Sequence, residues 1–179
     1  LKTLRNALSW SSTIRELSIG TYMKTIQDEV TVANSWQNYA TERNVRFNEM
    51  EYHLPRENGL QAFKEVREVV ERDFPEVFFP FEVRYVKSDD IWLSPFFERE
   101  TMSIAVHRYF DEDYKPMFKA VEKIFKKYGG RPHWGKINTM TGQELSAHYK
   151  HWDDFKEVRQ QLDPQGKFLN PYLKSIFAV

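Results

Sequence analysis

The sequence predicts an α+β fold in which helices pack on one face of an antiparallel sheet. Two segments, residues 58–73 and 116–128, carry apolar side chains at the three-to-four-residue spacing of amphipathic helices. Three others, residues 46–53, 77–86 and 101–110, have the composition or the alternation of β-strands. Strands precede and follow helices without a strict strand–helix–strand rhythm, which favours an antiparallel sheet over a parallel one.

The first part of the chain gives weaker signals. Residues 1–19 are loosely helical, and residues 26–40 show a weak helical pattern among polar residues. In residues 46–53 apolar side chains alternate with polar ones, although Phe47 falls out of phase. The alternating apolar residues are Met50, Tyr52 and Leu54. This segment is therefore predicted to be a strand.

The helical segments have recognisable ends. Asn58 is expected to cap the first amphipathic helix. The second is expected to stop at Gly129-Gly130, because glycine readily forms a left-handed C-terminal cap. Residues 145–162 are predicted to be mostly helical, and residues 163–177 to be loop-like with a short apolar finish. The side chains expected to point inward from the third helix are Trp152, Phe155 and Val158.

Composition excludes several classes of protein. A chain of 179 residues predicts one domain, or one domain with a short appendage. Lys+Arg and Asp+Glu both total 26, so neither a nucleic-acid surface nor an anionic membrane surface is expected. The absence of cysteine excludes disulfides and cysteine-based zinc sites. No apolar run approaches the roughly 18 residues of a transmembrane segment. We expect a cytoplasmic location, with membrane association as the alternative.

Glu82 and Arg84 are the first candidate site residues. They lie two positions apart in the strand of residues 77–86, so their side chains share one face of it. One interpretation is an ordinary ion pair that faces solvent. The other is a polar wall of a cavity, in which the guanidinium donates to ligand hydroxyls and the carboxylate accepts from them.

His107 is the second candidate. It lies in the strand of residues 101–110, on a face shared with Ser103, Ala105 and Tyr109. A strand histidine often has only a structural role. As a functional group, it could hydrogen-bond a substrate hydroxyl or accept its proton near neutral pH.

Residues 131–136, R-P-H-W-G-K, form the densest motif, although basic and aromatic residues also occur in ordinary loops. His133 has no second ligand at helical spacing, so no metal site is predicted there. Glu144, His148 and His151 could share a helical face, for which solvent exposure is the expected explanation. The sequence contains no G-x-G-x-x-G, Walker-type loop or G-x-S-x-G. A self-contained nucleotide enzyme is therefore not predicted.

The motif at residues 131–136 is followed by a helical segment with Tyr149 and Phe155, and then by D-P-Q-G-K-F-L-N-P-Y-L at residues 163–173. Together these resemble the C-terminal region of the sugar-1,4-lactone oxidase and alditol oxidase family. This family belongs to the flavoproteins of the vanillyl-alcohol-oxidase type. The resemblance covers most of the chain from about Arg46 onward.

The resemblance implies roles for four residues. Glu82 and Arg84 match an E-x-R strand pair that lines the substrate pocket of the family. His107 is similar to a strand histidine of the alditol-oxidase pocket, where it would assist proton removal or positioning. Lys136 matches the motif lysine that contacts the substrate hydroxyl beside the flavin. The implied reaction is hydride transfer from a CH–OH group of a sugar lactone or polyol to FAD.

The resemblance also implies what the sequence lacks. His133 and Trp134 would shape the loop and pack near the flavin, but the family's FAD-binding domain lies before this region. We therefore expect residues 1–179 to be a substrate-binding cap domain whose partner is a missing FAD-binding domain. Alone, it should be colourless and inactive. The alternative is a stand-alone sugar-binding or interaction module without catalysis.

Overall fold

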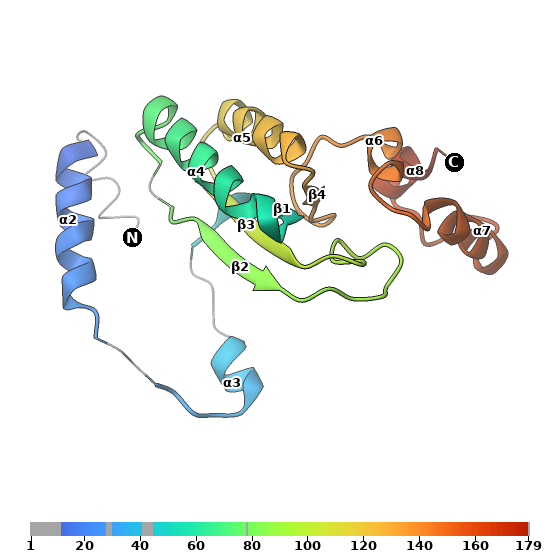
Figure 1. Ribbon diagram of the computed structural model, residues 1–179, viewed down its shortest axis with the longest axis horizontal. Coiled ribbons are helices and arrows are strands. Elements are labelled where there is room, and N and C mark those ends of the chain that lie inside the picture. The colour runs from blue at the N-terminus through green and yellow to red at the C-terminus, as the bar shows by residue number, and fades with distance from the viewer. Residues whose placement is uncertain (1–11, 28–29, 41–44, 78, 179) are drawn as a thin grey trace.

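A computed structural model describes residues 12–27, 30–40, 45–77 and 79–178. Its centre is a four-stranded sheet in the order β2-β3-β1-β4, in which each strand is antiparallel to its neighbours. Two long helices, α4 and α5, run side by side across one face of this sheet (Figure 1). The predicted α+β class, with helices packed on one face of an antiparallel sheet, is confirmed.

Two strands form the middle of the sheet. β1 spans Phe47–Pro55 and β3 spans Thr101–Tyr109, and they pair along their whole length from Phe47↔Tyr109 to Pro55↔Thr101. The edge strand β2, Glu82–Val86, pairs with β3, and the short β4, Arg131–Pro132, pairs with β1. The strand predicted for residues 77–86 is thus too long at its start. Proline lacks a backbone N–H to donate, and Pro80 lies two positions before Glu82, the first paired residue.

The helices that cover the sheet follow the predicted apolar spacing. α4 spans Arg56–Asp73, so Asn58 lies inside it and is not its cap; Pro55 holds the N-cap position and makes no side-chain cap hydrogen bond. α5 spans Lys115–Lys127. Its C-cap is Tyr128, and the next residue, Gly129, has a φ of 71°, the left-handed conformation expected there. The buried core between these helices and the sheet includes Met50, Tyr52, Leu54, Val66, Ile104, Val106, Val121 and Phe125.

The C-terminal part differs from the prediction. α6, Gly142–Ser146, and α7, Trp152–Leu162, are two helices separated by a turn, and α8, Pro171–Phe177, replaces the expected loop. Asn170 caps α8 by accepting a hydrogen bond from the backbone N–H of Leu173 at 2.8 Å. Trp152 is buried as predicted, but Val158 is 42% exposed. An aromatic cluster joins these helices to the loop after β4: Trp134, Tyr149, Trp152, Phe155 and Phe177.

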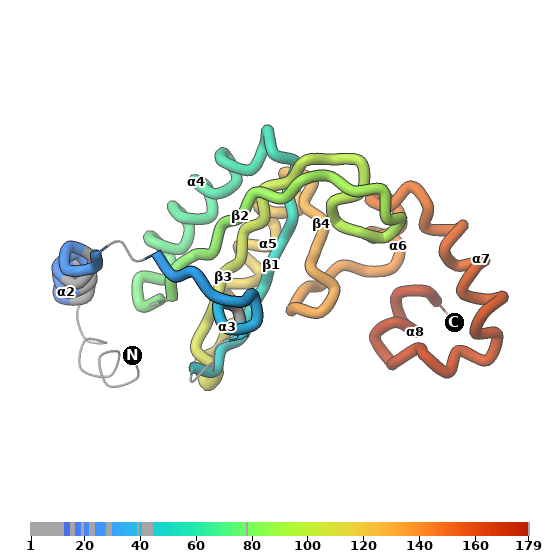
Figure 2. The backbone as a smooth tube through the Cα atoms, turned by 90° about the horizontal axis from the view of Figure 1, so that it is seen from below, coloured from blue at the N-terminus to red at the C-terminus, as the bar shows by residue number. Residues whose placement is uncertain are grey.

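The N-terminal elements lie apart from this core. α2 spans Ser12–Thr25 and α3 spans Ser35–Tyr39, so only a short piece of the weak pattern at residues 26–40 is helical. The start of the loosely helical segment predicted for residues 1–19 falls on residues 1–11, outside the described residues. α2 and α8 lie at opposite ends of the molecule in both ribbon and tube views (Figures 1 and 2).

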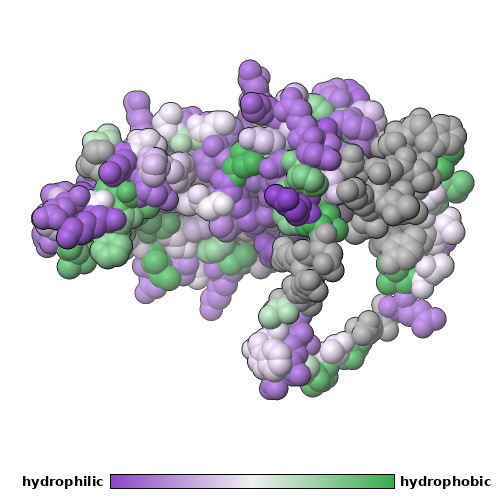
Figure 3. All heavy atoms as spheres, turned by 180° about the vertical axis from the view of Figure 1, so that it is seen from behind, coloured by the Kyte–Doolittle hydropathy of each residue, from purple (hydrophilic) through white to green (hydrophobic). Residues whose placement is uncertain are grey.

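The face of the molecule seen from behind is mostly polar in its described residues (Figure 3). In the view from behind, hydrophilic side chains cover much of the central body and hydrophobic ones are scattered between them (Figure 3). Within the described residues, no helix combines the length and the apolar composition that a membrane crossing requires.

Candidate functional site

Alternation along β1 divides its side chains between the two faces of the sheet. Met50, Tyr52 and Leu54 face the helices and are buried in the core. Glu49 and Glu51 therefore point to the opposite face, which the helices do not cover, together with His53. Glu51 and His53 are each only 3% exposed, so this second face carries buried polar groups.

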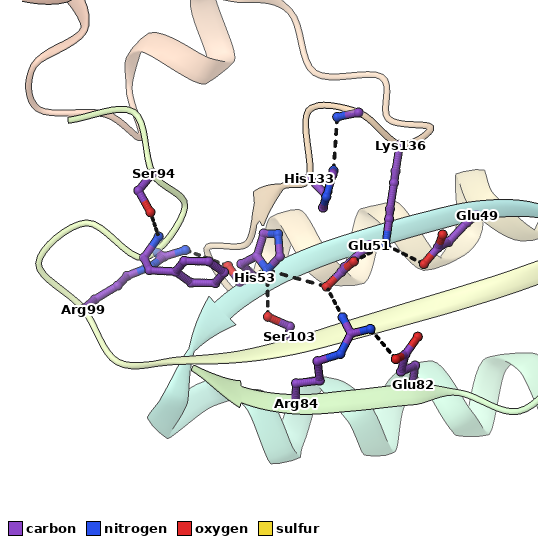
Figure 4. A network of polar contacts seen from close by, with 12 residues as sticks. Glu49, Glu51, His53, Glu82, Arg84, Ser94, Arg99, Ser103, His133 and Lys136 are labelled. Atoms are coloured by element: carbon purple, nitrogen blue, oxygen red, sulfur yellow. Dashed lines mark hydrogen bonds and ion pairs between the residues drawn. The ribbon is translucent and has the colours of Figure 1, made fainter. Parts of the chain in front are cut away.

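The neighbouring strands bring more polar residues to the same face. Ala105 of β3 pairs with Glu51 on one side and with Glu82 on the other. Ser103 likewise lies between His53 and Arg84. Pairing therefore lines up two rows across the sheet, one through Glu51 and Glu82 and the other through His53 and Arg84 (Figure 4).

Lys136 reaches this face from the loop after β4. The backbone N–H of His133 donates to the carbonyl of Glu51 at 2.9 Å, and that of Ile137 donates to the carbonyl of Glu49 at 3.0 Å. These bonds fix the loop along the edge of β1. The Lys136 ammonium lies 2.6 Å from Oε1 of Glu49 and also donates to Glu51 (Figure 4).

Glu51 connects this lysine to the predicted E-x-R pair. One nitrogen of Arg84, Nη1, lies 3.2 Å from Oε1 of Glu51, and the other, Nη2, donates to Glu82. The predicted residues Glu82, Arg84 and Lys136 thus meet through Glu51, although they lie up to 54 positions apart in the sequence. Figure 4 shows the four side chains converging between β1 and β2.

The opposite charges of Glu51 and Lys136 stabilise each other. Burial alone would raise the pKa of Glu51, but the hydrogen bond from Lys136 and the positive charges around it hold this pKa below its ordinary value. Burial likewise works against the charge of Lys136, yet its two carboxylate partners raise its pKa above the usual range. Both groups are therefore ionised near neutral pH.

His107 joins the cluster at its other end. Its side chain is 9% exposed, and Nε2 lies 3.3 Å from Oε1 of Glu49. Nδ1 lies 3.3 Å from the carbonyl oxygen of Pro80. Phe47 packs edge-on against its ring at 5.0 Å, which explains why Phe47 is out of phase with the core residues of β1. The structure therefore places His107 beside Glu49, with both ring nitrogens facing acceptors.

Three pockets open around these groups. The first, about 520 Å³, is lined by Glu51, His53, Arg84 and Lys136 together with Leu93, Pro95, Phe96 and residues 132–135. A second, about 650 Å³, lies on the other side of Lys136 and is lined by Phe47, Glu49, Asn138 and Tyr172, among others. A third, about 250 Å³, is lined by Glu82, His107, Phe47 and residues 79–81. The first pocket holds the densest set of charges and has the size of a small-molecule site.

His133 and Trp134 lie in different surroundings. His133 is exposed, and its Nδ1 accepts a hydrogen bond from the backbone N–H of Gly135 at 3.1 Å. The indole N–H of Trp134 donates to the hydroxyl of Tyr149 at 3.0 Å, and its ring packs against Trp152. Both line the first pocket, but Trp134 also anchors the loop in the C-terminal aromatic cluster.

A metal ion is a further possibility that the geometry raises. Among the described residues, Glu49, Glu82 and His107 can each offer one ligand atom, all within 4.8 Å of one another. However, Lys136 already neutralises Glu49, and Arg84 already pairs with Glu82. A metal ion at these ligands would therefore have to displace Lys136 and Arg84 from the two carboxylates.

Sequence reasoning missed four members of this site: Glu49, Glu51, His53 and Ser103. The signal for the first three was present, because they alternate with the apolar residues of the 46–53 strand. Alternation predicts only that these side chains point away from the core. It cannot show that the loop of residues 133–136 and the loop of residues 87–100 cover this face and bury them.

The fold and the pocket define this chain as an α+β domain with a pocket of charged side chains on the sheet face opposite α4 and α5. A family model described as D-arabinono-1,4-lactone oxidase matches residues 2–176. The chain belongs to this family, and the resemblance noted from its motifs is confirmed.

Several curated relatives support the assignment. Over 85% of its own length, this chain is 43% identical to an L-gulono-1,4-lactone dehydrogenase of Mycobacterium tuberculosis. It is 38% identical to the L-gulonolactone oxidase of Mus musculus over 71%, and 35% identical to an alditol oxidase of Streptomyces sp. over 70%. The matched region covers 34%, 30% and 30% of these relatives, so the chain spans about a third of their length.

Proposed function

We propose that this chain is the substrate-binding part of a flavin-dependent oxidoreductase that oxidises a CH–OH group of a sugar lactone or an alditol. The names of its relatives support the substrate class. The observation that carries the proposal is the Lys136 ammonium, which lines a pocket of about 520 Å³ and is held in place by Glu49 and Glu51.

Lys136 has the properties that such an oxidation requires. An ammonium has three N–H donors, and the two carboxylates account for two of them. The third can donate to a ligand hydroxyl. As the carbon of that hydroxyl loses a hydride, its oxygen gains negative charge, and a preorganised cation in a poorly hydrated site then stabilises it strongly. The raised pKa keeps Lys136 charged, so it acts as a donor and not as a base.

Arg84 and Glu82 would orient the ligand. The Arg84 side chain is 48% exposed, so N–H groups that Glu51 and Glu82 do not use can reach a second hydroxyl. Glu82 can accept from a neighbouring hydroxyl through its second oxygen. Together they hold the reacting carbon in a fixed position relative to Lys136.

His107 would position these groups. A carbonyl oxygen lies against one ring nitrogen and a carboxylate against the other, so acceptors fix the ring on both sides. We therefore assign His107 to holding Glu49, which in turn holds Lys136. The ligand's hydroxyl proton would leave to water in the open pocket.

A flavin supplies the missing electron acceptor when it is bound, because it takes the hydride from the ligand carbon. The residues fit contact with such a ring at the rim of the first pocket. His133 is exposed there, and the N–H of Gly135 fixes the orientation of its imidazole. Trp134 would support this loop from behind. The sequence offers no glycine-rich loop for the pyrophosphate, and the relatives are about three times as long as the matched region. We therefore propose that a separate FAD-binding domain completes the site.

The test compares the chain alone with the complete, flavin-containing protein. The chain alone should be colourless and unable to oxidise sugars. In the complete protein, anaerobic addition of an alditol or a sugar lactone should bleach the flavin absorption band. A complete protein whose flavin no alditol or lactone reduces would contradict the proposal. If the chain alone still bound sugars, the alternative of a binding module without catalysis would then stand.

A further inference from the structure

The first pocket has two chemically different ends. Lys136, Glu51 and Arg84 form the charged end described above. The other end is lined by His53 and by an apolar wall. This wall consists of Leu93, Pro95, Phe96 and Pro132. The His133 ring also lines this pocket, 6.0 Å from the His53 ring, but its Nδ1 already accepts a hydrogen bond from the N–H of Gly135. A buried polar ring beside apolar side chains, as at His53, is the composition of a subsite that recognises one ligand group.

The wall of this subsite is held firmly. The guanidinium of Arg131 donates to the carbonyl oxygens of Pro95 and Phe97 at 3.2 and 3.1 Å. Within the loop, the hydroxyl of Ser94 donates to the carboxylate of Asp89 at 2.6 Å. The subsite therefore exists before any ligand binds.

His53 presents one nitrogen to this subsite. Its Nδ1 lies 2.7 Å from the hydroxyl oxygen of Ser103 and 3.9 Å from Oε1 of Glu51. Phe96 packs edge-on against the ring at 4.9 Å. Within the described part of the chain, Nε2 makes no hydrogen bond, and His53 lines the pocket.

The protonation state follows from the surroundings. Burial lowers the pKa of His53 to about 4, so the ring is neutral near pH 7. The ionised carboxylate of Glu51 favours the tautomer with its proton on Nδ1, the nitrogen nearer to it. In that tautomer Nε2 carries a lone pair. It can accept a hydrogen bond from a hydroxyl but not from a carbonyl or a carboxylate.

We propose that His53 is a specificity-determining residue whose Nε2 accepts a hydrogen bond from a ligand hydroxyl remote from the reacting carbon. The apolar wall formed by Leu93, Pro95 and Phe96 contacts the C–H groups beside that hydroxyl. This inference rests on the proposed function and adds to it the part of the molecule that selects among alditols or lactones.

The experiment uses pairs of alditols, or of lactones, that are identical at the reacting end. One member of each pair has a hydrogen in place of the remote hydroxyl. The ratio of their kcat/KM values is measured for the complete protein and for His53→Phe, which keeps a ring of similar size but has no acceptor. The wild-type protein should prefer the hydroxylated member, and His53→Phe should reduce this preference by about tenfold or more. The rate with the deoxy member should change little.

Two further variants make the outcome decisive. His148→Phe carries the same replacement outside the residues that line the pocket, and should keep the wild-type ratio. If His53→Phe fails to fold, His53→Asn repeats the measurement with a smaller polar side chain that still reaches toward Ser103. An active protein whose ratio is the same in the wild type and the His53 variants would overturn this inference alone. A wild-type protein that oxidises neither member of any pair would overturn the proposed function and, with it, this inference.

Discussion

Two carboxylates lie buried on opposite faces of the same sheet, and they are compensated in different ways. Glu122 of α5 lies on the helix-covered face and is 4% exposed. It accepts hydrogen bonds from the hydroxyl of Tyr52 and the backbone N–H of Thr139, both at 2.6 Å. Glu51, next to Tyr52 in β1, is 3% exposed and meets the cations Lys136 and Arg84.

The different partners of Glu122 and Glu51 suit the two carboxylates to different roles. Neutral donors surround Glu122 from the core and from the segment after β4, so this network fastens α5 and that segment to the sheet. The partners of Glu51 themselves line a pocket and keep N–H groups that no acceptor among the described residues uses. A cluster with spare donors can bind a ligand, whereas a saturated network can only stabilise the fold.

Replacement of Lys136 should have the largest effect on activity. Lys136→Met keeps the apolar stem but removes the donor that stabilises the developing negative oxygen. Loss of one such donor typically raises the barrier by about 3–4 kcal/mol, so kcat should fall roughly a hundred- to a thousand-fold. Rapid-reaction measurement of flavin reduction in the complete protein checks this prediction.

The matched control is Lys123→Met, the same replacement on an exposed position of α5. It should leave kcat unchanged, because Lys123 lies on the helix side of the sheet. If Lys136→Met kept a kcat within a few-fold of the wild type, the lysine would be structural, and the contrast between the two faces would disappear.

Replacement of Glu122 should lower the stability of the protein but change its activity little. Glu122→Gln places an amide where three hydrogen-bond donors converge, so at least one donor loses its acceptor. We expect the free energy of unfolding to fall by about 1–3 kcal/mol, with kcat of the folded protein changed less than threefold. Urea unfolding and steady-state kinetics measure the two quantities. A large loss of kcat in a fully folded variant would show that the helix-covered face also serves the reaction.

The acid stability of the protein reports on Glu51. Its pKa in the fold is lower than the ordinary value of 4.5, so its pairing stabilises the fold above about pH 4.5 and is lost as the pH falls through the lowered pKa. Glu51→Gln removes this titration. The wild type should be more stable near neutral pH, and its advantage should shrink by up to about 1.4 kcal/mol per pH unit in acid.

Unfolding curves at several pH values between about 3 and 7 provide the measurement. Glu65→Gln is a useful control, because the pKa of Glu65 is also lowered, by hydrogen bonds from Lys127 and Tyr128 on the helix side. It should alter acid stability without altering substrate binding. Parallel unfolding profiles for the wild type and Glu51→Gln would mean that the Glu51 carboxylate is not held ionised by its neighbours.

Periodicity predicted the helix-covered face well. The apolar spacing in α4 and α5 and the alternation in β1 arise because these residues share one core. The C-terminal part was less predictable, since Gly142, the caps Thr141 and Asn170, and packing around Trp152 and Phe177 decide where its short helices begin and end. Local propensity is a weak guide to helices of five to eleven residues that tertiary contacts stabilise.

The sheet face opposite the helices was only partly predictable. Strand geometry placed Glu82 and Arg84 together, and the motif at residues 131–136 drew attention to Lys136. Glu51, the residue that connects all three, resembled an ordinary polar position in an alternating strand. Its importance arises from a loop more than eighty positions away, and no local pattern encodes such a contact.

The smallest change in stability, and the sharpest choice between the two interpretations of the E-x-R pair, should come from Arg84→Lys. The Arg84 and Glu82 side chains are 48% and 46% exposed, so the free energy of unfolding should change by less than about 1 kcal/mol. A lysine keeps the charge but cannot bridge Glu51 and Glu82 with a planar fork, so KM for the ligand should rise several-fold. The control is Arg56→Lys, because Arg56 forms a similarly exposed pair with Glu100 outside the pocket. It should change neither quantity. If KM were as insensitive to Arg84→Lys as to Arg56→Lys, the Glu82–Arg84 pair would be an ordinary surface ion pair, and the ligand would be held by Lys136 and the remaining pocket residues alone.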